Sequence, residues 1–209
     1  MLLYDYKAPS PRRVRIFLAE KGLVIATKNV DLSNGEQFAP DYHAKNPRCT
    51  VPTLELDDGI CLWDTLAICE YLEALHPQPP LFGRNPGEHA QVVMWYQRIE
   101  LDGFLSAAEL MRNASPAFKD HALTGPLPSP QIPALVERGR ARVLQFYQDM
   151  NARLGEAANI AGDFFSLADI QLLCVLDFAT GWGRMPVPAE NAALLTWHQR
   201  ISARTSTKA

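Results

Sequence analysis

A segment rich in proline and glycine divides this chain into two unlike parts. Between Pro77 and Glu88 the sequence PQPPLFGRNPGE contains four prolines and two glycines. Proline has no backbone N–H and glycine is conformationally free, so the segment favours a linker over a helix or a strand. Before it, short apolar runs alternate with helical spacing, and after it strand patterns largely disappear. We therefore predict a first domain at 1–78, a linker at 79–88 and a second domain at 89–209.

The first domain begins with a strand, a helix and a second strand. MLLYDY is a short apolar strand, RRVRIFLAEKG has helical spacing and stops at Gly22, and VIATKNVDL has strand character. A helix that crosses between two strands of one sheet makes those strands parallel. The apolar runs VPTLEL and ICLW follow, and the Asp57-Asp58-Gly59 turn between them is a hairpin signal. With the helix TLAICEYLEALH after Asp64, these segments predict a small α/β domain with a mixed sheet.

The second domain is predicted to be all-α. Helical spacing covers about 88–112, 131–154, 167–180 and 189–204, and the proline-rich polar stretch at 113–131 is predicted as a loop. Ser166 and Asp169 form the S-x-x-D pattern of a capping box in front of an apolar helix. This pattern is expected to fix the start of the helix, and we assign it no catalytic role.

The composition and the charge argue against several classes of binding partner. A formal net charge of −3 argues against a broad basic surface for nucleic acid. No run of about 18 apolar residues is present, so no membrane span is expected. The four cysteines, at 49, 61, 69 and 174, show neither CxxC spacing nor the spacing of zinc ligands. We predict reduced thiols, no metal and a cytoplasmic protein.

Two short segments in the first domain are candidates for binding a small peptide. Pro52 opens a strand, and a cis bond before it would turn the N–H and C=O of Val51 outward to pair with an extended ligand; a trans proline opening an edge strand is the alternative. Asp64 and Thr65 stand at a helix start, which suits an ammonium and a carboxylate on one carbon. The alternative is that Asp64 only caps the helix.

Other residues have both a functional and a plain interpretation. Ser10 lies between two prolines at the first helix start, where it could stabilise a thiolate or cap the helix. Arg12, Arg13 and Arg15 are interpreted as a solvated helix face. Cys49 is either a thiol near a ligand sulfur or a loop cysteine without a role. Candidates for an apolar pocket, which could equally be core residues, are Met94, Trp95, Met111 and Trp182.

Taken together, these segments resemble the soluble glutathione transferases over essentially the whole chain. The resemblance rests on SPRRVRIFLAEKG, on NP-x-x-x-VPTLEL-DDG-x-x-L-x-D-T-x-AI-x-x-YL, on the proline-rich linker and on AGDFFSLADI. It implies a thioredoxin-like α/β N-terminal domain, an all-α C-terminal domain, and a homodimer with an active site near the domain cleft.

The resemblance also implies how glutathione, the co-substrate, is held. Val51 would pair with the cysteinyl backbone of glutathione, and Pro52 would be cis. Asp64 and Thr65 would hold the amino and carboxylate groups of the γ-glutamyl unit. The family more often has Glu-Ser at these last two positions. Thr50 stands where glutamine or lysine is frequent and would help to hold the tripeptide.

Ser10 is the candidate catalytic residue. It falls where some bacterial members of the family have cysteine or asparagine, and a backbone N–H at the helix start is the alternative thiolate donor. The implied activity is the addition of the glutathione thiolate to a small hydrophobic electrophile. A glutathione-dependent reductase or isomerase remains an alternative. For a reductase, Cys49 is the only candidate thiol. For an isomerase, the APSP segment lacks the serine-cysteine cluster of that branch of the family. A non-catalytic module that binds a protein partner is the third interpretation.

Overall fold

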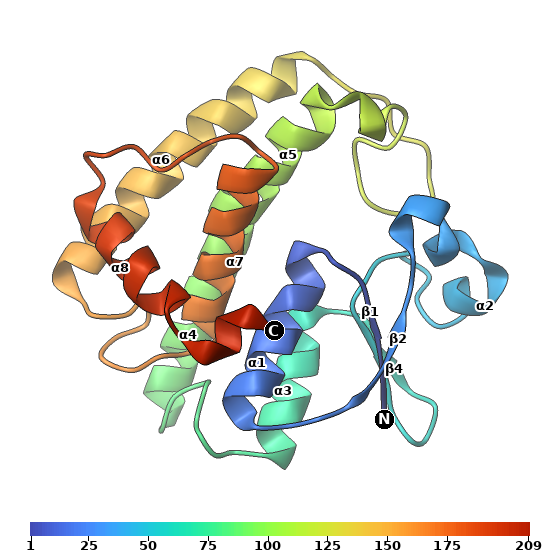
Figure 1. Ribbon diagram of the computed structural model, residues 1–209, viewed down its shortest axis with the longest axis horizontal. Coiled ribbons are helices and arrows are strands. Elements are labelled where there is room, and N and C mark those ends of the chain that lie inside the picture. The colour runs from blue at the N-terminus through green and yellow to red at the C-terminus, as the bar shows by residue number, and fades with distance from the viewer.

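The computed structural model describes residues 1–209 as a small sheet domain followed by a helical domain (Figure 1). The first domain contains β1 (Leu2–Asp5), α1 (Pro9–Lys21), β2 (Ala26–Asn29), the 3₁₀ turns η1 (Leu32–Asn34) and η2 (Glu36–Phe38), α2 (Pro40–His43), β3 (Thr53–Glu55), β4 (Cys61–Leu62) and α3 (Thr65–Leu75). The second contains α4 (Pro86–Arg98), the π-helical turn η3 (Ile99–Phe104), α5 (Leu105–Ala114), η4 (Pro116–Phe118), α6 (Ala134–Glu156), α7 (Leu167–Gly181), α8 (Ala192–Ser202) and η5 (Thr205–Lys208).

The sheet has the strand order β2-β1-β3-β4 and is mixed, as predicted. β1 runs parallel to β2, and Leu2 pairs with Ala26. β1 and β3 are antiparallel, as are β3 and β4, which form the hairpin predicted around Asp57-Asp58-Gly59. Gly59 has φ 86°, a left-handed conformation that glycine adopts without steric cost. Figure 1 shows α1 and α3 between the sheet and the helical domain, with α2 on the other side of the sheet.

One core joins the two domains. Phe17 of α1, Leu72 of α3 and Leu172 of α7 belong to a single cluster of 37 buried residues, so the domain boundary is itself part of the core. α7 is buried along most of its length and packs against α1. This packing fixes the start of α1 relative to the helical domain.

Asp169 anchors the beginning of α7. The predicted capping box is present: Asp169 Oδ2 accepts hydrogen bonds from the Ser166 backbone N–H (3.0 Å) and hydroxyl (2.9 Å). Its Oδ1 accepts from the Ile160 N–H at 3.0 Å and from the Trp197 indole N–H at 3.3 Å. The side chain is fully buried, and burial raises the pKa of Asp169 to about 6. One carboxylate therefore ties together the start of α7, the preceding loop and α8.

Arg13 corrects the prediction of a solvated arginine face on α1. It is 2% exposed, pairs with Glu100 Oε2 at 3.1 Å, and its guanidinium lies 4.4 Å from the centre of the Phe104 ring. Arg13 lies four residues before Phe17, so both side chains fall on the buried face of the helix. Arg12 and Arg15 are partly exposed, and each is held by an aspartate in an ion pair.

Lys21 holds the end of α1 to the chain that leaves α3. Its whole side chain is buried, with Nζ 2.5 Å from Glu73 Oε2 in an ion pair. Nζ also donates to the carbonyls of His76 (2.8 Å) and Pro79 (2.5 Å). A buried charge is stable only with such partners. The pair therefore fixes the course of the chain between α3 and α4.

The last turns of the chain return to α1. Arg204 donates two hydrogen bonds to Glu20, at 2.8 and 2.7 Å, and the Ser206 hydroxyl bonds the same carboxylate. Arg12 donates to the Thr207 carbonyl at 3.3 Å. η5 thus packs along α1, which places the C-terminus beside the N-terminal domain (Figure 1).

Candidate active site

The loop before β3 leaves one residue with unpaired backbone groups. The Val51–Pro52 peptide bond is cis, and neither the N–H nor the C=O of Val51 makes a hydrogen bond within the protein. The Thr50 carbonyl is held from inside by the Tyr42 hydroxyl at 2.5 Å and by Asn46 Nδ2 at 2.8 Å. The loop is therefore fixed on its inner side, while the Val51 backbone remains available for pairing.

Asn46 is a structural determinant of this loop that sequence reasoning did not single out. Its side chain is fully buried and also donates to Thr53 Oγ1 at 3.1 Å, so one amide ties the loop to the first residue of β3. The signal was present, because Asn46 is the asparagine of the NP-x-x-x-VP pattern. A buried asparagine next to a proline turn is a strong constraint, but the sequence does not reveal its partners.

Asp64 caps α3, as the plainer interpretation proposed. Its Oδ1 accepts from the backbone N–H groups of Leu66 (2.9 Å) and Ala67 (3.1 Å). The side chain is exposed, and its Oδ2 has no partner in the protein. Thr65 is the first residue of the helix and is 5% exposed, and its hydroxyl also makes no hydrogen bond. Capping therefore uses only Oδ1 of Asp64, and it leaves Oδ2 of Asp64 and the hydroxyl of Thr65 free.

Ser10 does not cap α1, which corrects that interpretation. The N-cap is Ala8, and Ser10 is the second residue of the helix, between Pro9 and Pro11. Because the two prolines carry no N–H, Ser10 supplies the only backbone N–H among the first three helical residues. Its hydroxyl makes no hydrogen bond within the protein, and its side chain is half-buried. The mouth of α1 therefore presents an amide and a hydroxyl from one residue.

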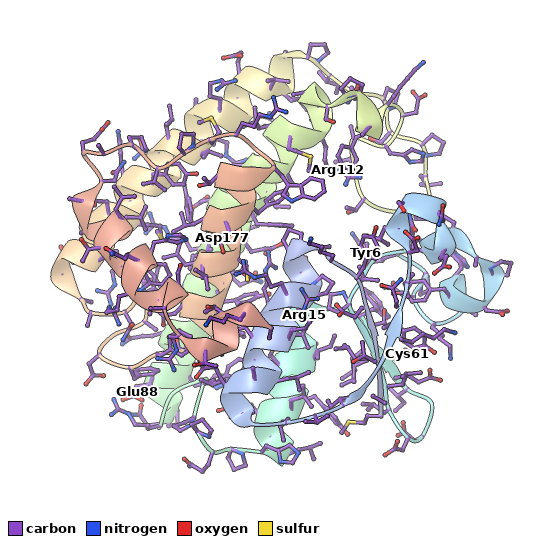
Figure 2. The ribbon with its side chains drawn as sticks, viewed as in Figure 1. Tyr6, Arg15, Cys61, Glu88, Arg112 and Asp177 are labelled. Carbon is purple, nitrogen blue, oxygen red and sulfur yellow. The ribbon has the colours of Figure 1, made fainter.

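A small pocket lies between the start of α1 and α7. Its volume is about 160 Å³, and it is lined by Lys7, Ala8, Pro9, Arg12, Cys174, Asp177, Phe178 and Trp182. Figure 2 shows Asp177 in the region where α7 approaches α1. The pocket thus joins the mouth of α1 to the helical domain.

Only one of the predicted pocket residues lines this pocket. Trp182 does so, at 65% exposure. Met94 is 56% exposed on α4 and Met111 is buried in the core that spans both domains, and neither lines this pocket. Met111 illustrates why: an apolar side chain on a helix more often faces the core than a ligand. Asp177 and Phe178, which do line the pocket, carried no sequence signal of their own.

The charges in this pocket form a connected group. Arg12 Nη1 lies 2.5 Å from Asp177 Oδ2, and His198 Nε2 lies 2.7 Å from Asp177 Oδ1. Burial alone would raise the pKa of Asp177, but the hydrogen bonds from His198 and Arg12 outweigh it and hold that pKa below its ordinary value. Asp177 is therefore ionised at neutral pH and both of its oxygens are occupied.

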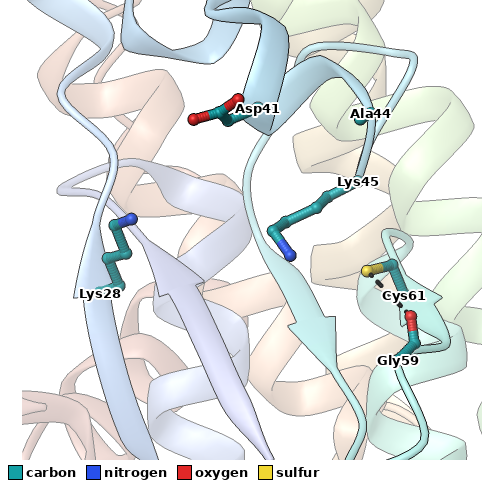
Figure 3. A pocket seen from close by; sticks show the side chains of 6 residues that line it. All are labelled: Lys28, Asp41, Ala44, Lys45, Gly59 and Cys61. Atoms are coloured by element: carbon teal, nitrogen blue, oxygen red, sulfur yellow. Dashed lines mark hydrogen bonds between the residues drawn. The ribbon is translucent and has the colours of Figure 1, made fainter.

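A second, wider hollow lies away from these residues. Figure 3 shows it lined by Lys28, Asp41, Ala44, Lys45, Gly59 and Cys61, with a volume of about 800 Å³. Lys45 is paired with Glu55 at 2.7 Å. None of the predicted site residues lines it. Val51, Asp64-Thr65 and Ser10 therefore stay the candidate residues for the active site.

Cys49 is a buried loop cysteine. It is 5% exposed and adopts φ 52°, a left-handed conformation that favours glycine. Burial raises the pKa of the Cys49 thiol. Because the thiolate is the reactive form, this environment does not favour a redox or nucleophilic role.

The first domain has the order β-α-β-α-β-β-α with a cis proline before β3, and a helical domain follows it, which is the arrangement expected of a glutathione transferase. Two family models match the chain: the glutathione S-transferase N-terminal domain over residues 9–75 and the C-terminal domain over residues 111–205. Glutathione S-transferase 2 of Saccharomyces cerevisiae is 37% identical over 214 aligned positions, which cover 100% of this chain and 88% of the yeast protein. The chain belongs to the glutathione S-transferase family.

Solved structures agree with this assignment. A glutathione S-transferase domain-containing protein from Marinobacter aquaeolei VT8 superposes with a TM-score of 0.91 at 34% identity, covering 99% of this chain and 100% of that one. A glutathione transferase homologue from Sulfitobacter, solved with bound glutathione, has a TM-score of 0.79 at 25% identity, and the match covers 99% of this chain and 94% of the Sulfitobacter chain.

No helix of the protein has the length and apolarity needed to cross a bilayer.

Proposed function

We propose that this protein binds glutathione, stabilises its thiolate and adds the sulfur to a small hydrophobic electrophile. The observation that carries the proposal is the unpaired backbone N–H and C=O of Val51, held in place by Asn46 and Tyr42. An extended peptide pairs with such groups by strand addition, and the cysteinyl unit of glutathione presents a matching N–H and C=O.

The charged end of glutathione would lie at α3. The γ-glutamyl carboxylate suits the hydroxyl of Thr65 and the positive end of the helix dipole, and the ammonium suits the free Oδ2 of Asp64. Thr50 and Pro52 flank the pairing residue and complete the binding segment. The thiol would then face the mouth of α1, where the N–H and hydroxyl of Ser10 can both donate to a thiolate.

The chemistry required is modest. Hydrogen bonds to the thiolate lower the thiol pKa, and the pocket at Phe178 and Trp182 would hold the electrophile close to the sulfur. The sulfur attacks the electrophilic carbon, a C–S bond forms, and the leaving group departs with its bonding electrons. No metal takes part in this scheme.

Replacing the charge of Asp64 tests the placement of glutathione. Asparagine caps helices as well as aspartate does, so Asp64→Asn removes the charge and preserves the cap. We expect the dissociation constant for glutathione to rise about tenfold, as for a lost charge-assisted hydrogen bond, with little change in melting temperature. Isothermal titration calorimetry and a thermal melt measure the two effects.

A second variant and a control complete this test. Thr65→Val, which removes the hydroxyl, should also weaken glutathione binding. Asp31→Asn changes the other aspartate N-cap of the first domain, the partly exposed Asp31 at η1, and should leave binding unchanged. Unchanged affinity in both Asp64→Asn and Thr65→Val would contradict the placement. Absence of glutathione binding by the unaltered protein would favour the non-catalytic module.

The helix made of α4, η3 and α5 supports the proposal of a homodimer. It exposes Met94, Leu101 and Leu105, at 56%, 54% and 45%, and Ile60 and Trp63 of the first domain are also exposed, at 55% and 43%. Large exposed apolar side chains are frequent at protein interfaces. We propose that a second copy of this chain covers the helical residues.

A charge on this surface should separate the two copies. We expect Leu101→Glu to convert a dimer into a monomer in analytical ultracentrifugation, because burial of an unpaired carboxylate opposes association. Leu123→Glu is the matched control, since Leu123 is 69% exposed in the loop beyond α5 and should leave the dimer intact. A Leu101→Glu protein that still sediments as a dimer would exclude this surface.

A further inference from the structure

The pocket beside α1 has the size of one aromatic ring. Its volume of about 160 Å³ is close to that of an engineered cavity, about 150 Å³, that admits benzene. Phe178 is 6% exposed and forms a buried wall, while Trp182 is 65% exposed at the rim. Aromatic walls favour a flat aromatic ligand through stacking and edge contacts.

The charges that line the pocket do not cancel. Arg12 is paired with Asp177 at 2.5 Å, and the other oxygen of Asp177 is bonded to His198 at 2.7 Å. Lys7 also lines the pocket, is exposed, and makes no ion pair or hydrogen bond within the protein. The adjacent helix start adds the positive end of its dipole. An unpaired cation therefore remains at the pocket, next to the mouth of α1.

We propose that the electrophile is a single-ring compound with an anionic substituent, which the ammonium of Lys7 holds. This inference rests on the proposed transferase function and narrows its substrate class. The ring would lie against Phe178 and Trp182, and the carboxylate or similar group would pair with Lys7. The reaction is that already described: the glutathione sulfur forms a bond to the electrophilic carbon, and the leaving group takes the electrons of the broken bond.

Two matched electrophiles test this inference on the full-length protein. para-(Chloromethyl)benzoate carries the anionic group, and para-(chloromethyl)benzamide is its neutral counterpart of similar shape. After correction for the uncatalysed rates, we expect kcat/KM to be about threefold to fivefold higher for the benzoate, the size typical of a solvent-accessible ion pair. The preference should decrease at high sodium chloride concentration, because salt screens exposed charges.

Two lysine variants assign the preference to one residue. Lys7→Met should abolish it, and Lys28→Met, a change in the hollow of Figure 3, should retain it. A preference that is absent from the unaltered protein, or that persists in Lys7→Met, overturns the inference. Conjugation of both compounds without preference would leave the proposed transferase function in place.

A binding measurement separates this inference from the transferase proposal. The unreactive para-methylbenzoate and para-methylbenzamide are titrated calorimetrically into protein saturated with S-methylglutathione. Tighter binding of the benzoate that depends on Lys7 supports the anion-binding role of Lys7 in this pocket even if neither chloride is conjugated, and failure of conjugation would then count against the transferase proposal and not against the anion site. Equal binding of the two ligands overturns the inference.

Discussion

The free energy of unfolding is expected to fall by about 3–5 kcal/mol when Asp169 is replaced by alanine. The carboxylate accepts hydrogen bonds from the backbones of Ile160 and Ser166, the hydroxyl of Ser166 and the indole of Trp197. All of these donors are buried, and alanine would leave them without partners. A buried donor without an acceptor costs about 1–3 kcal/mol, so the loss of several exceeds the effect of an ordinary substitution.

Urea denaturation followed by circular dichroism measures this change. Asp163→Ala is a suitable control, because Asp163 is a nearby aspartate whose side chain is 81% exposed and whose only partner is Arg84 on the surface. That variant should lose less than about 1 kcal/mol. An Asp169→Ala protein with the stability of the control would show that the carboxylate is dispensable for the start of α7.

Replacing Ser10 by alanine is expected to raise the pKa of the bound glutathione thiol by about one to two units. The hydroxyl would no longer donate to the thiolate, and a hydrogen bond to a charged group is worth about 1.5–3 kcal/mol, where one pKa unit corresponds to about 1.4 kcal/mol. A raised thiol pKa leaves less thiolate at neutral pH. The rise of kcat/KM with pH should therefore move to higher pH, and turnover at neutral pH should drop by about tenfold or more.

Ultraviolet titration of the complex and a pH–rate profile measure these effects. Ser10→Thr keeps a hydroxyl at the same place and should recover much of the activity. The dissociation constant of glutathione should change little in either variant, because the proposed contacts of the tripeptide are at Val51, Asp64 and Thr65. A thiol pKa that is unchanged in Ser10→Ala would assign thiolate stabilisation to the backbone N–H of residue 10.

The sequence predicts those parts of the fold that depend on near neighbours. The Asp57-Asp58-Gly59 hairpin, the cap at Asp64 and the capping box at Ser166 and Asp169 each involve residues a few positions apart, and all three are present. Local chemistry decides such features, so the same residues predict them in any chain.

Features that join distant segments could not be predicted in this way. Arg12 and Asp177 are 165 positions apart, and Arg13 and Glu100 are 87 apart. An arginine in a charged run is normally exposed, and only the packing of α1 against α7 and η3 shows that Arg13 is buried. The sequence also could not predict that Phe178 lines a pocket. A helix face that contacts a ligand and a helix face that packs in the core show the same spacing of apolar residues.

The return of η5 to α1 has a consequence for biosynthesis. Arg12 and Glu20 receive partners from Thr207, Arg204 and Ser206, so these contacts form only after residues 204–207 have left the ribosome. Domains of many proteins fold in order of synthesis. Here α1, which carries Ser10, gains these supports from η5, a segment synthesised after the sheet and after α4 to α8, so a nascent chain has the sheet before α1 is fully braced.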